Sequence, residues 1–118
     1  MSGALVHADY LNLIKKNKII GKIDENTQIQ PSSLDLSLSD ECYEIKASFL
    51  SPRSKVRDKL KYISLKKINL KNSIIFKKNK IYLVKLNEKL NLNNSISGHC
   101  NPKSTTGRLD IFCRTILD

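Results

Sequence analysis

The sequence predicts a mostly β fold, an antiparallel barrel or sandwich with one helix in front of it. Three features of the 118-residue chain lead to this prediction. The first stretch has the apolar spacing of a helix, most of the remainder alternates apolar and polar residues, and polar clusters separate the alternating runs. These clusters occupy residues 39–41, 71–73, 77–79 and 91–94. Short strands at such close and regular spacing are typical of barrels and sandwiches.

The first predicted helix begins near Asp9, a residue type that is suited to be an N-cap. An apolar face follows, and basic residues near the end of the helix suit the negative end of its dipole. The apolar positions are Tyr10, Leu11, Leu13 and Ile14, and the basic ones are Lys15, Lys16 and Lys18. We expect Gly21 to end this helix.

A second short helix is predicted from about Ser54 to Tyr62, because Val56, Leu60 and Ile63 recur at i, i+4 and i+7. The predicted strands alternate at period two, which places one set of side chains on each face. Their apolar sets are Leu34, Leu36 and Leu38; Tyr43 and Ile45; Ile68 and Leu70; Ile74 and Phe76; and Ile81 and Leu83.

The length predicts a single domain over residues 1–118, with room for one modest core. Residues 114–118 have the composition of the middle of a strand, so we expect the sheet to be incomplete and the domain truncated at its C-terminal end. An open sheet edge must be paired or covered, because otherwise the chain aggregates through it. We therefore expect either a truncated product or an obligate oligomer.

The net charge of +10 favours an anionic partner such as a nucleic acid or a membrane surface. Lysine far outnumbers arginine, however, which favours charges scattered over solvated faces. Aromatic residues make up 6% of the chain, and neither a base-stacking platform nor a recognition helix is recognisable. We therefore expect no nucleic-acid partner.

Neither a membrane span nor a signal peptide is recognisable in the sequence, so we expect a cytoplasmic protein without a membrane partner. The cysteines, Cys42, Cys100 and Cys113, are widely spaced and contain no Cys-x-x-Cys pair. This pattern indicates neither a disulfide framework nor a zinc site. Reduced thiols packed in or near the core are the expectation.

Residues 101–110, Asn-Pro-Lys-Ser-Thr-Thr-Gly-Arg-Leu-Asp, combine cations, hydroxyls and a glycine in one turn-like segment. Arg108 can grip a phosphate with two hydrogen bonds, Lys103 can supply a mobile charge, and hydroxyl donors follow at Ser104 and Thr105. The order of residues is not that of a P-loop, and no strand-to-helix transition is recognisable. A phosphate site and a plain polar turn between strands are both compatible with this pattern.

The first patterned strand carries a carboxylate among its leucines. Pro31 stands at its entrance, where a missing N–H is harmless. Asp35 alternates with the leucines and is expected to face away from their core. It is either a solvated edge carboxylate or a group that orients a cation or a loop at a subunit contact.

Together, the run Gln-Pro-Ser-Ser-Leu-Asp-Leu and the later Pro-Lys-Ser-Thr-Thr-Gly-Arg-Leu motif resemble the deoxycytidine triphosphate (dCTP) deaminase family. The residues of the later motif, with Ala-Ser-Phe-Leu at residues 47–50, most resemble the N-terminal part of the long bacterial form. The likeness runs over nearly the whole chain from the first helix. It implies a dUTPase-like fold, that is, a β-clip in the form of a distorted barrel or jelly roll.

The resemblance also implies a homotrimer with active sites shared between subunits. The implied reaction is hydrolytic deamination of dCTP to dUTP and ammonia, with magnesium carried by the triphosphate and no catalytic metal. The sequence itself also indicates no catalytic zinc, since it lacks the His-x-Glu and Pro-Cys-x-x-Cys pattern of the zinc deaminases. Lys103, Ser104, Thr105 and Arg108 take the triphosphate-binding positions of the motif, with Ser104 and Arg108 also supporting catalysis.

Two departures from the family pattern limit what the resemblance implies. Ser37 and Ser39 stand where relatives often carry arginine and glycine. The family's catalytic glutamate lies downstream of Asp118, and Glu25, Glu41, Glu44 and Glu88 are not at matching positions. A positioned general base raises the reaction rate about 10²–10⁴-fold. We therefore expect this chain alone to be inactive or nearly so.

Other readings of the sequence remain open at this point. A deoxyuridine triphosphatase, or a bifunctional enzyme that carries dCTP through to dUMP, fits the same motifs. A non-catalytic basic module that binds polyanions is a further possibility from another functional class.

Overall fold

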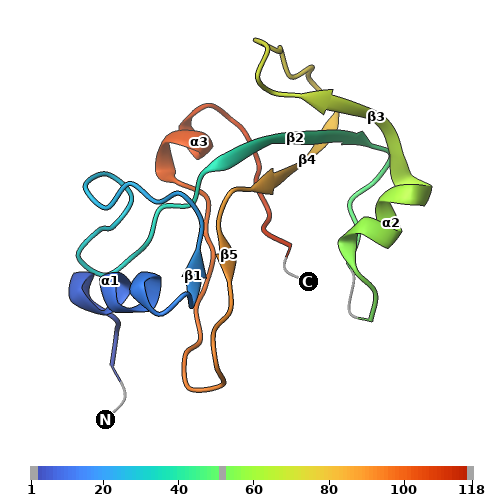
Figure 1. The fold of residues 1–118 in the computed structure, drawn as a ribbon. Helices are drawn as coiled ribbons and strands as arrows, with labels where there is room; N and C mark the ends of the chain where they lie inside the picture. Colours follow the sequence, from blue (N-terminus) through green and yellow to red (C-terminus); the bar gives the residue numbers. More distant parts are fainter. Residues whose placement is uncertain (1–2, 51–52, 117–118) are drawn as a thin grey trace.

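The structure is a computed structural model that describes residues 3–50 and 53–116 (Figure 1). Strands dominate its central part, and short helices flank them. In chain order the elements are α1 (His7–Lys15), β1 (Ile19–Ile20), β2 (Leu38–Ile45), α2 (Val56–Ile63), β3 (Ser64–Asn69), β4 (Ile81–Leu86), β5 (Lys89–Leu90) and α3 (Ser104–Arg108). The predicted class, mostly β with an N-terminal helix and open sheets, is confirmed.

The main sheet has three antiparallel strands in the order β3-β2-β4. Strand β2 lies at the centre, where Cys42 faces Ile68 of β3 and Val84 of β4. Cys42 is completely buried, and Ile45 and Ile68 are nearly so. The alternation predicted for Tyr43 and Ile45 and for Ile81 and Leu83 therefore produced real strands. Cys100 and Cys113 are exposed, so the expectation of core thiols is wrong for these two.

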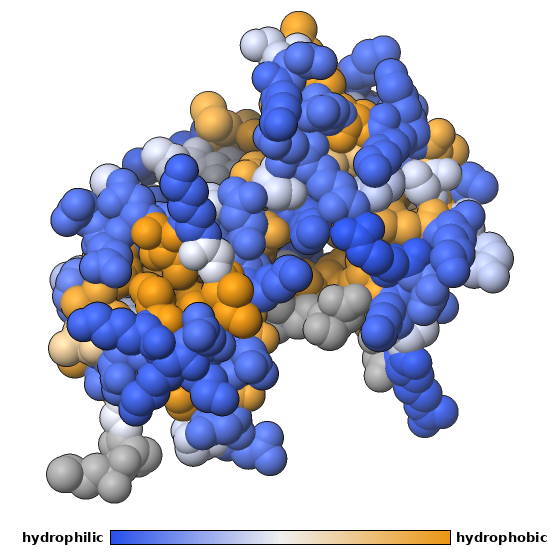
Figure 2. Space-filling view, in the orientation of Figure 1, coloured by the Kyte–Doolittle hydropathy of each residue, from blue (hydrophilic) through white to orange (hydrophobic). Residues whose placement is uncertain are grey.

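A second, two-stranded sheet pairs β1 with β5 and lies beside α1 (Figure 1). Leu13 of α1 and Ile19 of β1 are buried there. Gly21 follows β1 with φ of 154°, a conformation that other residues rarely adopt. A Cβ at this position would lie 3.3 Å from the Cα of Glu88, so glycine permits the close approach of the two segments. Figure 2 shows apolar surface among the hydrophilic residues over this part of the molecule.

The first helix differs from its prediction at both ends. It begins after Val6, and the carboxylate of Asp9 accepts a hydrogen bond from the Val6 N–H at 2.9 Å. Asp9 therefore lies inside the first turn, where a carboxylate also favours the helix dipole, and is not the N-cap. The helix ends at Lys15, and Asn17 adopts a left-handed φ of 53°. Asn17, and not Gly21, turns the chain out of the helix.

Three predicted strands are wrong. Residues 29–37 form an irregular segment with one isolated bridge between Ile29 and Leu34, and β2 starts only at Leu38, which is exposed. Residues 74–76 lie in the loop between β3 and β4, where Phe76 stacks on Tyr82. Residues 114–116 contain no strand, and residues 117–118 of the same predicted strand lie outside the described part. Alternation alone does not produce a strand when no neighbour pairs with the backbone.

Candidate functional site

The phosphate-binding candidate segment folds as a single helical turn, α3. Lys103 precedes it in an extended conformation and its carbonyl accepts hydrogen bonds from the N–H groups of Thr106 and Gly107. Asp110 adopts a left-handed φ of 56° just beyond the end of the turn. The sequence left a phosphate site and a plain polar turn both open and showed no strand-to-helix transition here, whereas the structure forms a helical turn over residues 104–108. In Figure 1, α3 lies beside the start of β2.

The side chains of α3 are exposed, apart from that of Thr106, which is half-buried. Ser104 and Arg108 are separated by four residues, which places them on the same face of the turn. Both are exposed, as is Thr105. Within residues 3–50 and 53–116, the side chain of Arg108 takes part in no hydrogen bond or ion pair, so its guanidinium has all its donors available for a ligand. A hydroxyl and a free guanidinium on one face can bind the oxygens of a phosphate.

Lys103 lies next to α3 and has a partner from a distant part of the chain. Its ammonium donates a hydrogen bond of 2.6 Å to Oδ2 of Asp35. The sequence offered two roles for Asp35, a solvated edge carboxylate or a group that orients a cation or a loop at a subunit contact, and the structure pairs it with a cation of its own chain. The pair joins the irregular segment 29–37 to the start of α3.

Glu88, which does not match the position of the family's catalytic glutamate, is a buried carboxylate. It accepts hydrogen bonds from the Ser37 N–H at 2.9 Å, the Ser37 hydroxyl at 2.7 Å and the Gln28 amide at 2.7 Å. Burial raises the pKa of Glu88, but the hydrogen bonds from Ser37 and Gln28 outweigh it and hold the pKa below the ordinary value of 4.5. Nothing local in the sequence reveals that Glu88 is buried and hydrogen-bonded, because its partners lie more than fifty residues away.

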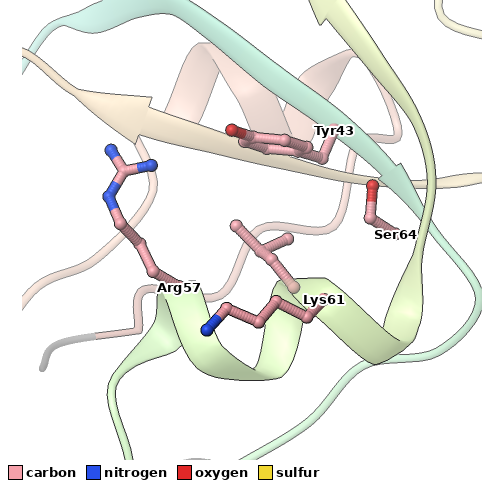
Figure 3. Close-up of a pocket in the computed structure, with 5 residues that line it drawn as sticks. Tyr43, Arg57, Lys61 and Ser64 are labelled. Atoms are coloured by element: carbon pink, nitrogen blue, oxygen red, sulfur yellow. The ribbon is translucent and has the colours of Figure 1, made fainter.

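A shallow pocket of about 370 Å³ lies between α2 and the main sheet, lined by Tyr43, Arg57, Leu60, Lys61 and Ser64 (Figure 3). Its cations make it a competing phosphate site. However, Arg57 donates two hydrogen bonds, of 2.8 and 3.1 Å, to the carboxylate of Glu41. These bonds, with one from the Tyr43 hydroxyl, lower the pKa of Glu41 to about 2. The guanidinium in this pocket is therefore already neutralised, whereas that of Arg108 is not.

In the described part of the chain, no group of three or more histidine, cysteine, aspartate or glutamate side chains is arranged to hold a metal ion. No helix among the same residues is long and apolar enough to cross a bilayer.

The segment 30–36 and the α3 segment are the two parts that resembled the dCTP deaminases, and the Asp35–Lys103 pair brings them together. A comparison with protein families gives a match over residues 1–118 to the 2′-deoxycytidine 5′-triphosphate deaminase N-terminal domain. The chain belongs to the dCTP deaminase family. This family is one of hydrolases in nucleotide metabolism, as the sequence resemblance predicted.

A solved dCTP deaminase supports the assignment at the level of the fold. The crystal structure of 2′-deoxycytidine 5′-triphosphate deaminase from Agrobacterium tumefaciens superposes with a TM-score of 0.86 and 38% sequence identity. The match covers 93% of this chain and 34% of that chain. The chain thus spans about a third of the length of this dCTP deaminase. A comparison with curated protein sequences gives no significant match.

Proposed function

We propose that the chain is the triphosphate-binding, N-terminal part of an enzyme that hydrolyses dCTP to dUTP and ammonia. The observation that carries the proposal is the unpaired guanidinium of Arg108, which shares one face of α3 with the Ser104 hydroxyl. Arg108 binds phosphate oxygens with two hydrogen bonds, and Lys103 adds a point charge. Ser104 and Thr105 donate hydroxyl hydrogen bonds. Magnesium reaches the site as part of the substrate, bound to the triphosphate.

In the proposed reaction, water attacks C4 of the cytosine and ammonia leaves. This attack requires a general base within hydrogen-bonding reach of the water. Two carboxylates beside the segment 29–37 are already engaged, Asp35 by Lys103 and Glu88 by Ser37 and Gln28. We therefore propose that residues 1–118 bind the nucleotide and do not deaminate it alone. Ser104 and Arg108 support catalysis by fixing the substrate, and the complete site is shared between subunits of a homotrimer.

The test is calorimetric titration of the chain with dCTP in the presence of magnesium. We expect saturable binding that Arg108→Ala weakens about tenfold or more, because a charge-assisted contact is lost. Arg53→Ala, which removes another exposed arginine, is the matched control and is expected to bind like the unchanged chain. An ammonia assay in parallel is expected to show no product. Equal binding by the Arg108 and control variants would contradict the proposal, and release of dUMP would favour the deoxyuridine triphosphatase or bifunctional alternative.

A non-catalytic polyanion-binding role is the second candidate, and the charge distribution favours it. Lys66, Lys67, Lys77 and Lys78 form no ion pair with a carboxylate in the described residues, and three of them line a hollow of about 270 Å³ beside the β3–β4 loop. Nonspecific binding to a phosphate backbone falls steeply with added salt. Binding of single-stranded DNA that resists Arg108→Ala and disappears in moderate salt would support this role over dCTP binding.

A further inference from the structure

Asp35 lies outside the α3 motif but is fixed in place more firmly than any side chain of that motif. Its N–H donates to the Gln28 carbonyl at 2.8 Å, and its own carbonyl accepts from the Gln28 amide at 2.9 Å. Its carboxylate accepts a further hydrogen bond of 3.3 Å from the Gln30 amide. The side chain is 25% exposed, against 65% for its partner Lys103. Within this ion pair, the carboxylate is therefore the fixed member and the ammonium the mobile one.

The fixed position of Asp35 depends on the buried carboxylate of Glu88. The same Gln28 amide group that bonds to the Asp35 carbonyl also donates to Glu88, at 2.7 Å. Ser37, two residues beyond Asp35, is held by Glu88 through both its N–H and its hydroxyl. Glu88 therefore holds the irregular segment on both sides of Asp35. This chain of hydrogen bonds ends at Lys103, directly before α3.

We propose that Asp35 is a positioning residue, which holds the Lys103 ammonium in place for the triphosphate and fixes the start of α3. The proposal rests on the proposed function, since it assigns to Asp35 a part in the same nucleotide site. A lysine ammonium has three N–H donors, and Asp35 accepts from one of them. The others remain available to phosphate oxygens, so Lys103 binds the triphosphate while it keeps its bond to Asp35.

The positioning role and the charge of Asp35 predict opposite changes in nucleotide affinity when the carboxylate is removed. Asp35 is a negative charge beside a site for a polyanion, so its charge alone opposes binding. Neutralising it in Asp35→Asn should tighten nucleotide binding if charge is all that matters. If Asp35 instead orders Lys103, the same variant should weaken binding, because the long lysine side chain must then lose its freedom when the ligand binds. The direction of the change in Kd separates the two effects.

The binding arm of the test uses the 118-residue chain with dCTP and magnesium. We expect Asp35→Asn to weaken dCTP binding about fivefold, in line with the upper range for exposed ion pairs. Asp35→Glu should recover most of the affinity, because it restores the carboxylate. In a Lys103→Gln background, Asp35→Asn should have no further effect, because Asp35 acts through Lys103. Tighter binding by Asp35→Asn, or equal weakening in both backgrounds, would overturn the proposal.

A second arm needs no ligand and separates this proposal from the proposed function. In amide spectra of the free chain, Asp35→Asn should shift the resonances of residues 104–108, and Asp35→Glu should shift them less. Asp40→Asn is the matched control, because Asp40 pairs with Lys71 at 3.9 Å on a different part of the surface. Unchanged α3 resonances in Asp35→Asn would overturn the positioning role whatever the binding result. Shifted resonances in a chain that does not bind dCTP would support the positioning of α3 and refute the nucleotide site.

Discussion

Single residues hold distant parts of this chain together, and Glu88 is the clearest example. Its buried carboxylate accepts hydrogen bonds from Gln28 and Ser37, and Gly21, just after β1, allows close approach to the backbone of Glu88. A buried carboxylate without such partners would be strongly unfavourable. Here the hydrogen bonds favour the ionised form enough to keep its pKa below the ordinary value. One side chain therefore contacts both ends of the irregular segment 29–37, through Gln28 just before it and Ser37 at its end.

Replacing this carboxylate should weaken the fold in a pH-dependent way. Because the folded-state pKa of Glu88 is depressed, its stabilising effect is complete above the unfolded pKa near 4.5 and is lost as the pH falls through the lower folded-state value. We expect Glu88→Gln to lower the free energy of unfolding by about 1–3 kcal/mol at pH 7, since bonds to a charged acceptor are lost. The difference should shrink when urea unfolding is repeated below pH 4.

Glu25→Gln serves as the control for this experiment, because Glu25 is exposed. It should leave the unfolding curve unchanged at either pH. A Glu88→Gln chain that is as stable as the unchanged chain at pH 7 would show that the buried carboxylate does not hold segment 29–37.

At the scale of elements, α2 was predictable because its signal is local. Its apolar face repeats within eight residues, and the observed helix starts within two residues of the predicted one. Residues 29–37 were not predictable, because their conformation depends on Glu88, which lies some fifty residues further along the chain. The motif of the candidate site was readable from residue types alone. The Lys103–Asp35 pair was not, since it joins residues 68 positions apart.

Leu60 and the Arg57–Glu41 ion pair both join helix α2 to the sheet. Leu60 is buried, and Arg57 reaches Glu41 of β2 across the pocket of Figure 3. We expect Leu60→Ala to lower the free energy of unfolding by about 2 kcal/mol, because it removes a buried side chain and enlarges the pocket. Lys61→Ala, at the exposed neighbouring position, should have little effect. The measurement is urea unfolding followed by circular dichroism, and equal curves for the two variants would contradict this view of α2.

The whole molecule is less compact than a globular domain of the same length. Its radius of gyration is 15.8 Å, whereas a compact chain of this size has about 13.5 Å. In the three-stranded sheet, β3 and β4 each pair with β2 on one side, which leaves their other edges unpaired among the described residues. Large apolar side chains are exposed just beyond α3, namely Leu109, Ile111 and Phe112. Open edges and exposed apolar side chains both favour association with other chains.

Self-association through the segment after α3 is the expected consequence. Phe112 is 94% exposed, and it lies four residues from Arg108, so a second copy of the chain that covers it would also lie beside the proposed nucleotide site. We expect sedimentation to show species heavier than the 13.4 kDa monomer, and Phe112→Ser to shift them toward the monomer. Ile75→Ser, which removes an equally exposed side chain from the β3–β4 loop, should leave the distribution unchanged. A monomer at every concentration, or an equal response to both substitutions, would place the subunit contact elsewhere and would separate oligomerisation from the α3 site.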